Sequence, residues 1–544
     1  MKTAELIGRT LVEAGVDHVF GVVGSGNFDV TDAMVGAGAT YVAARHESGA
    51  ATMADAYARM TGGIAALTVH QGCGLTNAMT GITEAAKSRT PMVVLAAEAT
   101  QPLSNFHVDQ TALAESVGAV PMRVDDPATA RDTARNAAQT ALADRRVVLL
   151  NLPLEVQEAD ATDQVELRVA PVEPAQESPA PAEADVRRLG DALRTARRPV
   201  FVAGRGGRGP GCREVLEALA EQSGALLATS AVTKGLFNGN PWSLDVSGGF
   251  ASPLAADLIK GADLIVGWGC ALNMWTMRHG RLIADDATVV QVDLDIDALG
   301  AHRDIAFGVV GDVRQTAEAV SSELRDETLP GYRTDRLRDD IAARNAWRDV
   351  PYDDAGTDER IDPRTLCLAL DELLPTERVV GVDSGNFMGY PSMFLRVPDE
   401  FGFCFTQAFQ SIGLGLATTI GAALARPDRL PIAALGDGGA LMSAAEFETV
   451  ARLGIPMVVV IFNDQAYGAE VHHFRGRSLD SVTFPDTDFA AIARGYGYEA
   501  ITVRNRDDLA PVADWLAERS RPLLIDAKVV ADEPSWWLSE AFGH

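Results

Sequence analysis

Short apolar runs rich in β-branched residues alternate along the whole chain with longer, alanine-rich stretches. Such runs are typical of fully buried parallel strands, and the stretches between them have the length of helices. This alternation predicts an α/β fold built from doubly wound parallel sheets. The clearest runs read HVFGVVG, GIAALTVHQG, PMVVLAAE, PVFVAGRGG, ADLIVGWG, ATVVQVDLD, RVVGVDSG, LPIAALGDGG and IPMVVVIFND.

Two segments interrupt the alternation and divide the chain into three blocks. Ala170–Ala184 is rich in Pro, Ala and Glu. A second segment within Asp326–Pro363 is dense in charge, and a short helix is expected in it over Arg336–Arg348. The length of 544 residues also suits about three domains. The predicted domains cover residues 1–170, 185–325 and 360–530.

Composition narrows the possible classes of function. The formal net charge is −28, which argues against nucleic acids and anionic membranes as partners, since both require a basic face. The sequence has no run of about 20 apolar residues that would predict a membrane span, and no apolar leader follows Met1. The five cysteines lie far apart, so they suggest neither a disulfide framework nor a zinc site. These features predict a cytoplasmic protein in a reducing compartment.

Polar residues that follow the apolar runs are the candidates for chemistry, because ligands of open α/β sheets bind beyond the carboxyl ends of the strands. In the third block, a predicted strand over Leu430–Leu435 precedes Asp437, and a predicted strand over Pro456–Phe462 precedes Asp464. A helix is expected between them from about Ser443 to Leu453. The two aspartates are 27 positions apart, which is the length of one βαβ unit. We therefore predict that the two carboxylates lie side by side.

The residues around the first aspartate suit a phosphate group. Gly436, Gly438 and Gly439 let backbone N–H groups approach an anion, and hard oxygen ligands on a shared sheet edge suit Mg²⁺ that holds a diphosphate. A Gly-Asp-Gly triplet alone is a weak signal, because glycine often marks turns. Together with the Asn-Asp-x-x-Tyr-Gly stretch that begins at Asn463, it resembles the thiamine diphosphate motif of a known enzyme family. That family includes pyruvate decarboxylase, benzoylformate decarboxylase and acetolactate synthase.

The resemblance implies which residues bind the cofactor and its metal ion. Asp437, Asp464 and the backbone carbonyl of Ala466 correspond to the metal ligands of the family. Asp464 stands where asparagine is commoner, but aspartate is an equally hard oxygen ligand, so Mg²⁺ remains the expected metal. The glycines of the Gly-Asp-Gly segment are expected at the diphosphate, together with Asn463, which would support the turn, and Tyr467.

Two further positions acquire a role from the same resemblance. A predicted strand over Thr40–Ala44 is followed by Glu47 and by a helix over Ser48–Met60 that contains Ala54-Asp55-Ala56-Tyr57-Ala58. The family carries its activating glutamate just before such a helix. This implies that Glu47 hydrogen-bonds the N1′ nitrogen of the aminopyrimidine, where a raised pKa would help it. Ile412 corresponds to the bulky apolar residue that bends the cofactor, although an isoleucine there would also suit core packing.

Substrate-facing residues are expected on the loops of the first block and on one helix of the third. Ser25 follows the first predicted strand and His70 the third, and benzoylformate decarboxylase has serine and histidine at the corresponding positions. Histidine can shuttle protons and serine can hold a carboxylate, but His70 could also be an ordinary polar loop residue. Glu470 corresponds to an active-site glutamate of pyruvate decarboxylase, with an exposed helical glutamate as the alternative. The roles of four other histidines stay open: His107, His279, His472 and His473.

The middle block contains one glycine-rich loop, Gly204-Arg205-Gly206-Gly207-Arg208-Gly209. Its spacing does not match the dinucleotide-binding fingerprint, so we interpret this block as a structural domain. Binding of FAD or of a CoA or ADP moiety, which some relatives show, is the alternative.

The resemblance covers essentially the whole chain and implies pyrimidine-binding, central and diphosphate-binding domains in that order. It implies an enzyme that uses thiamine diphosphate and Mg²⁺ to break or form a carbon–carbon bond next to a carbonyl. A decarboxylase of a 2-oxo acid, with possible carboligation, is the leading hypothesis. The alternative is an acetolactate synthase-like carboligase, which is a transferase, or an acyloin or 2-hydroxyacyl lyase. The segment Asn105–Gln110 lacks the Phe-Gln-Glu usual in acetolactate synthases. Because the cofactor of this family spans two subunits, a homodimer or homotetramer is expected.

Overall fold

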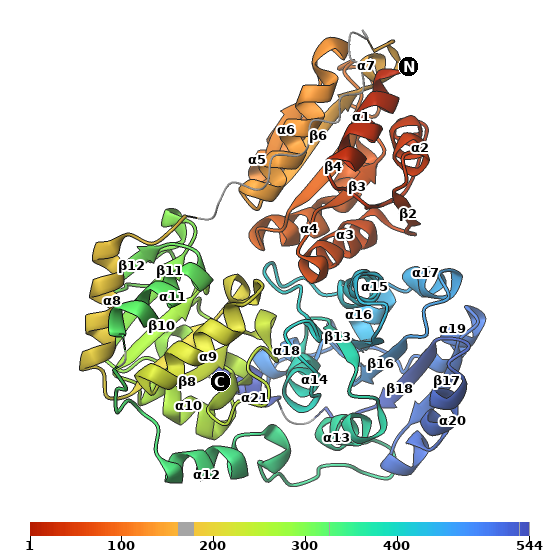
Figure 1. The fold of residues 1–544 in the computed structure, drawn as a ribbon. Coiled ribbons are helices and arrows are strands. Elements are labelled where there is room, and N and C mark those ends of the chain that lie inside the picture. Colours follow the sequence, from red (N-terminus) through yellow and green to blue (C-terminus); the bar gives the residue numbers. More distant parts are fainter. Residues whose placement is uncertain (162–178, 326, 532–533, 543–544) are drawn as a thin grey trace.

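The computed structural model describes residues 1–161, 179–325, 327–531 and 534–542. These residues form three domains, and each domain is built around a six-stranded sheet (Figure 1). Every strand pair in the three sheets is parallel, as between β1 (His18–Gly21) and β2 (Thr40–Ala43). This arrangement, with helices flanking the sheets, confirms the predicted fold class.

The first sheet has the strand order β2-β1-β3-β4-β6-β5. Strand β6 (Val147–Pro153) is buried along its whole length, as expected for a strand covered on both faces. The other strands of this sheet are β3 (Ala65–Val69), β4 (Met92–Glu98) and β5 (Val120–Arg123). Its helices are α1 (Thr3–Glu13), α2 (Phe28–Gly36), α3 (Glu47–Thr61), α4 (Cys73–Lys87), α5 (Gln110–Ser116), α6 (Ala130–Ala143) and α7 (Leu154–Glu158).

The second sheet has the order β12-β11-β10-β7-β8-β9. Its strands are β7 (Pro199–Ala203), β8 (Leu226–Thr229), β9 (Ser243–Val246), β10 (Leu264–Trp268), β11 (Thr288–Asp293) and β12 (Phe307–Val310). Helices α8 (Glu183–Thr195), α9 (Cys212–Ser223), α10 (Pro253–Lys260) and α11 (Val313–Leu324) cover it. Helix α12 (Asp335–Arg344) lies in the charged segment that follows, where the short helix was predicted.

The third sheet has the order β14-β13-β15-β16-β18-β17. Its strands are β13 (Arg378–Val382), β14 (Phe403–Cys404), β15 (Leu430–Gly436), β16 (Val458–Asn463), β17 (Glu499–Val503) and β18 (Leu523–Lys528). Its helices are α13 (Pro363–Leu373), α14 (Gly389–Phe394), α15 (Gly415–Ala425), α16 (Asp437–Met442), α17 (Glu446–Arg452), α18 (Gly468–His473), α19 (Phe489–Gly495), α20 (Pro511–Glu518) and α21 (Trp536–Phe542).

The first and third domains share a core through α3 and α15, which face each other across the domain boundary (Figure 1). Ala54 of α3 and Ile420 of α15 are fully buried in the same apolar cluster. Gly421 allows the close approach, because a Cβ atom there would lie 2.3 Å from the backbone oxygen of Met53. The two candidate sites predicted from sequence therefore lie in domains that are packed tightly against each other.

The structure differs from the sequence-based prediction at one helix near the candidate site. A helix was expected from Ser443 to Leu453, but α16 begins at Asp437 itself and α17 follows as a separate short helix. The reason is local: Asp437 follows β15 directly and occupies the first turn of α16, where an acidic side chain interacts favourably with the helix dipole. The prediction therefore began the helix six residues too late.

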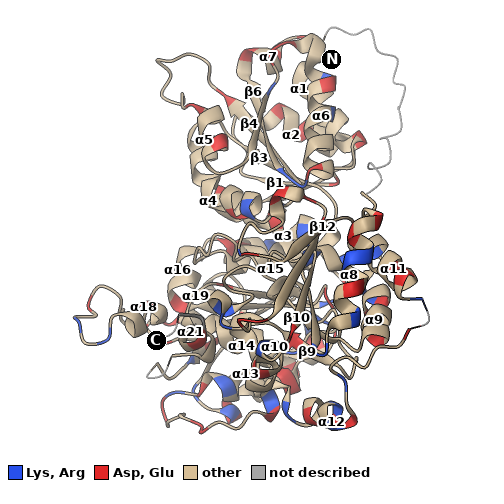
Figure 2. Cartoon of the chain, turned by 90° about the vertical axis from the view of Figure 1, so that its left-hand side faces the viewer, with Lys and Arg blue, Asp and Glu red and all other residues tan. Residues whose placement is uncertain are grey.

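Most of the predicted linker Ala170–Ala184 lies outside the described residues, and α8 begins within its last residues. Lys and Arg positions (blue) are interspersed with Asp and Glu positions (red) along the cartoon of Figure 2. Among the described residues, every helix is too short or too polar to span a membrane.

Candidate active site

Two aspartates lie at the carboxyl ends of neighbouring strands in the third domain. Strands β15 and β16 are paired in parallel, with Gly436 opposite Phe462, and Asp437 and Asp464 follow them. The Asp437 carboxylate accepts a hydrogen bond of 2.8 Å from the N–H of Gly438. This geometry brings the two predicted carboxylates together.

Burial gives these two carboxyl groups unusual acidities. Burial raises the pKa of Asp437 to about 6, and burial together with the charge of Asp437 raises the pKa of Asp464 to about 8. Two desolvated carboxylates that repel each other are costly to ionise, and a divalent cation between them would remove that cost. The described residues contain no cluster of three or more metal-binding side chains. Two carboxylates with a backbone oxygen suit Mg²⁺, which keeps several waters and binds phosphate oxygens.

The turn after β16 packs against the first turn of α16. A Cβ atom at Gly438 would lie 2.4 Å from the ring of Tyr467, and one at Gly468 would lie 2.4 Å from an Asp464 carboxylate oxygen. Glycine at both positions thus leaves room for the tyrosine ring and the carboxylate. Asn463 is buried and donates a hydrogen bond of 3.0 Å to Asp526 of β18. Its side chain therefore anchors the end of β16, which suits its expected role in supporting the turn.

The segment that carries Ile412 is held by a carboxylate that the sequence analysis did not single out. Asp383 follows β13, is fully buried, and accepts hydrogen bonds of 2.9 and 3.3 Å from the N–H groups of Gly413 and Leu414. Burial raises its pKa to about 6. A signal was present, because in the run RVVGVDSG this aspartate directly follows the last apolar residue, as Asp437 follows its strand at the same sheet edge.

The second cluster lies in the first domain, where Glu47 begins α3. Its carboxylate accepts a hydrogen bond of 3.1 Å from Asn77 of α4. His70 is close enough for the Glu47 charge to act on it, but burial dominates and lowers the pKa of His70 below its usual 6.5. The His70 Nδ1 atom accepts a hydrogen bond of 3.3 Å from the N–H of Gly26. This contact ties His70 to the loop of Ser25, whose side chain is exposed.

The backbone just before Glu47 is fixed by the third domain of the same chain. The buried Glu446 of α17 accepts hydrogen bonds of 3.0 Å from the N–H groups of both Arg45 and His46. Sequence reasoning missed Glu446, because a contact across about 400 positions leaves no local pattern.

The structure does not bring the two clusters into contact. Among the described residues, no hydrogen bond or ion pair joins Glu47, His70 or Ser25 to Asp437 or Asp464. The first cluster also opens to solvent through Cys73 and Asn77, which are both exposed. One chain therefore presents two separate groups of candidate residues.

The remaining candidates from the sequence are Glu470 and four histidines, and each has a contact of its own in the structure. Glu470 of α18 has a carboxylate oxygen 3.8 Å from the Nδ1 atom of His473, and the Nε2 atom of His472 lies 3.4 Å from the Asn386 side-chain nitrogen. His279 packs edge-on against Trp275 at a ring distance of 5.7 Å. His107 contacts the backbone oxygen of Ala99 at 2.9 Å.

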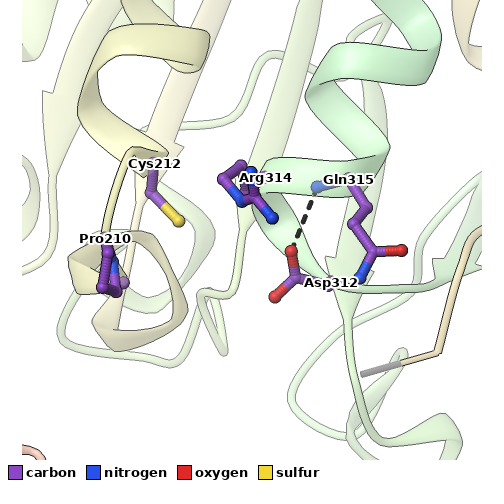
Figure 3. A pocket seen from close by; sticks show the side chains of 6 residues that line it. Pro210, Cys212, Asp312, Arg314 and Gln315 are labelled. Atoms are coloured by element: carbon purple, nitrogen blue, oxygen red, sulfur yellow. Dashed lines mark hydrogen bonds between the residues drawn. The ribbon is translucent and has the colours of Figure 1, made fainter. Parts of the chain in front are cut away.

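The middle domain contains a cavity of about 350 Å³ at the first turns of α9 and α11 (Figure 3). The Asp312 carboxylate caps α11 by accepting a hydrogen bond of 3.0 Å from the N–H of Gln315, so it occupies the place that a phosphate would take there. The nearby glycines have a packing role, since Cβ atoms at Gly204 and Gly206 would lie within 2.7 Å of Gly269. Close packing against Gly269 is thus sufficient to explain why these two positions are glycine.

Comparison with known families assigns each domain. Residues 1–117 match the N-terminal TPP binding domain of thiamine pyrophosphate enzymes, residues 186–320 match their central domain, and residues 383–527 match their C-terminal TPP binding domain. The three matches follow one another in the predicted order and together span most of the chain.

Curated relatives of full length carry several activities. The chain is 28% identical over 547 residues to a sulfoacetaldehyde acetyltransferase of Alcaligenes xylosoxydans xylosoxydans, covering 94% of this chain and 89% of that protein. It is 29% identical over 518 residues to a probable 2-ketoarginine decarboxylase of Pseudomonas aeruginosa, covering 92% and 89%. It is 27% identical over 539 residues to the acetolactate synthase large subunit of Parasynechococcus marenigrum, covering 95% and 85%.

A solved structure has the same fold. The thiamine diphosphate-dependent 4-hydroxybenzoylformate decarboxylase of Rhodococcus jostii RHA1 superposes with a TM-score of 0.82 at 22% identity, covering 98% of this chain and 100% of that chain.

Proposed function

Because the chain belongs to the thiamine pyrophosphate enzyme family, we propose that it uses thiamine diphosphate and Mg²⁺ to decarboxylate a 2-oxo acid, with carboligation as a possible second outcome. The observation that carries the proposal is the pair of carboxylates at adjacent strand ends, the buried Asp437 and the partly buried Asp464. A pair of this kind needs a cation, and the glycines around it leave room for an anion that shares the cation.

Each candidate residue has a defined task in this proposal. Asp437, Asp464 and the carbonyl oxygen of Ala466 would hold the metal ion, and Gly438 and Gly439, which lack side chains, would leave room for the diphosphate beside it. Thiamine diphosphate, when bound, supplies an electron sink for the electrons released by carbon–carbon cleavage.

The other residues act on protons and on the substrate. Glu47 would hold a proton at the aminopyrimidine N1′ nitrogen, and Ile412 would contact the ring system of the cofactor. His70, neutral near pH 7 because its pKa is lowered, would form a hydrogen bond to the substrate carbonyl. Ser25 binds the substrate carboxylate, and Glu470 returns a proton after CO₂ has left.

We further propose that a second copy of the chain completes the site, since the Glu47 cluster and the Asp437 cluster do not meet within one chain. Apolar side chains beside both clusters are exposed, which suits burial by a partner subunit: Phe106 packs against His70 with 42% of its surface exposed, and Met442 of α16 is 61% exposed.

Subunit complementation tests this arrangement. Glu47→Gln and Asp437→Ala variants should each be inactive, yet a mixture that exchanges subunits should regain about a quarter of the wild-type activity. Half of randomly paired dimers are hybrids, and each hybrid has one intact site of two. If both sites lay within single chains, every hybrid would stay inactive.

The reaction itself is tested with a panel of 2-oxo acids, by measuring CO₂ release with and without acceptor aldehydes. An acyl-transferring reaction is the second candidate, favoured by the relatives described as sulfoacetaldehyde acetyltransferases. Sulfoacetaldehyde therefore belongs in the panel. CO₂ release that requires both thiamine diphosphate and Mg²⁺ supports the first proposal. Turnover of sulfoacetaldehyde, followed as release of sulfite from its C–S bond and transfer of the remaining acetyl group to an added acceptor such as phosphate, without turnover of any 2-oxo acid, would replace it with the second.

A further inference from the structure

The loop between β14 and α15, residues 405–414, forms backbone hydrogen bonds at two places to buried carboxylates from different domains. Asp383 of the third domain binds its last residues, as described above. Glu84 of α4, in the first domain, binds its middle. None of the roles proposed above involves these hydrogen bonds of Glu84.

Glu84 is fully buried, and both of its carboxylate oxygens accept hydrogen bonds from the loop. One carboxylate oxygen accepts a hydrogen bond of 3.0 Å from the N–H of Ala408, and the other accepts one of 2.6 Å from the N–H of Phe409. The Arg59 guanidinium pairs with Glu84 at 2.8 Å and donates a further hydrogen bond of 2.8 Å to the Phe405 carbonyl. Burial opposes ionisation of Glu84, but Arg59 and the two N–H groups outweigh it and lower its pKa.

Only three residues lie between Phe409, which is bound by Glu84, and Gly413, which is bound by Asp383. One of these three residues has a strained backbone. Gln410 adopts a φ of +62°, which is unfavourable for a residue with a side chain. Ser411 and Ile412 follow it, and both are partly exposed. A strained conformation persists only where its surroundings hold it, and here the holding groups are Glu84 before the segment and Asp383 after it.

We propose that Glu84 is a positioning residue, which fixes the height and orientation of Ile412 and thereby the bend of the cofactor against which Glu47 works. The inference rests on the proposed function, since it assigns Ile412 to the cofactor. Glu84 touches neither the cofactor nor the substrate in this scheme. Its action passes through the N–H groups of Ala408 and Phe409.

A matched buried ion pair in the same chain serves as the control. Asp371 is as deeply buried as Glu84, pairs with Arg378 at 2.8 Å, and accepts a backbone hydrogen bond of 2.9 Å from Arg396. Arg378 begins β13, whereas Asp383 follows its end, so the control lies at the opposite edge of the sheet from the candidate site. Asp371→Asn removes the same kind of interaction without touching the loop.

The first measurement needs no cofactor. Glu84→Gln keeps the size of the side chain but turns its NH₂ group toward one of the loop N–H groups, so at least one hydrogen bond to a charged group is lost. Amide hydrogen exchange of the 405–414 segment should accelerate roughly tenfold to a hundredfold in Glu84→Gln and stay at the wild-type rate in Asp371→Asn. Glu84→Asp is the second variant. It retains the charge opposite Arg59 but withdraws the carboxylate by one methylene, and it should act in the same direction.

The second measurement follows the thiazolium ring proton of bound thiamine diphosphate by NMR. Its exchange should slow about tenfold in Glu84→Gln, while the metal-dependent dissociation constant of the cofactor changes less than about threefold, because the metal ligands are intact. Wild-type exchange rates in both Glu84 variants, or a loosened loop with unchanged ring-proton exchange, would overturn the inference. Equal slowing in Asp371→Asn would overturn it too. Failure of the wild-type protein to bind thiamine diphosphate would instead contradict the proposed function.

Discussion

The two halves of the candidate site differ in how completely one chain builds them. Around Asp437, the chain supplies two neighbouring carboxylates that are buried or partly buried, a glycine-lined first helical turn and a packed tyrosine. Around Glu47, it supplies a half-buried carboxylate and a neutral histidine, with Ser25 and Asn77 open to solvent.

The difference follows from what each half must do. Two carboxylates repel each other, so they stay close only if the surrounding backbone holds them, and the strand ends of one sheet provide that support. A carboxylate that acts on a ring nitrogen needs desolvation at the moment of reaction, and a covering subunit can supply it. We therefore predict that substitutions around Asp437 prevent cofactor binding, whereas substitutions around Glu47 leave the cofactor bound and lower the reaction rate.

The largest effect is expected for Asp437→Ala, which should abolish metal-dependent retention of thiamine diphosphate, because the proposed Mg²⁺ site has few protein ligands. The cofactor content after gel filtration in Mg²⁺ measures it, with the exposed Asp514→Ala on α20 as the control. The raised pKa of Asp437 means that its ionised form destabilises the metal-free fold above about pH 6. The melting temperature of the apo variant should therefore match or exceed that of the wild type. Stoichiometric cofactor in the purified variant would contradict the assignment.

Glu47→Gln should have the next largest effect and a different signature. Glutamine keeps the size and a hydrogen bond but cannot carry the charge that stabilises a proton on the ring nitrogen. Exchange of the thiazolium ring proton should slow by ~10²–10⁴-fold, the usual range for a general acid–base group. Metal-dependent cofactor binding should survive, since the metal ligands lie in the other domain. Glu13→Gln, at an exposed position of α1, is the control. Unchanged ring-proton exchange would mean that a different group activates the cofactor.

The contrast between these residues also shows what the sequence could predict. The strand ends at Asp437, Asp464 and Glu47 could be read locally, because an apolar run followed by a charged residue marks the edge where ligands bind. Glu84 and Glu446 could not, since their partners lie more than 300 positions away and both sit within ordinary helical sequence. Local patterns thus indicate candidates for ligand-facing groups, but they do not reveal the buried groups that hold the neighbouring segments in place.

Acidification should weaken Mg²⁺ binding, because protons compete with the metal for the carboxylate pair. The pKa of Asp464 is raised to about 8 and that of Asp437 to about 6. The metal-free protein therefore carries protons on both carboxyl groups at low pH, and Mg²⁺ must displace these protons to bind. The ionised fraction of a group with a pKa near 8 falls about fiftyfold between pH 8 and pH 6, and the Mg²⁺ affinity at fixed thiamine diphosphate should fall roughly tenfold to fiftyfold. Asp464→Asn should flatten this profile. A pH-independent affinity in the wild type would show that the pair is not the metal site.

The smallest effects are expected at the open half, for Ser25→Ala and His70→Ala. His70 is neutral near pH 7, because burial lowers its pKa, and the Ser25 hydroxyl is neutral as well. Each side chain then contributes one hydrogen bond between neutral donors or acceptors and the substrate, so turnover should fall about three- to tenfold for each. The cofactor dissociation constant should stay unchanged, which separates these variants from Asp437→Ala in a single titration. For His70, turnover of the wild type should also decline at pH values well below 6.5, because the lowered pKa of the imidazole shifts its protonation to lower pH, and this limb should disappear in His70→Ala. If either variant instead weakened thiamine diphosphate binding and turned over normally at saturation, the Ser25 loop would face the cofactor rather than the substrate, and the division of labour between the two halves would be wrong.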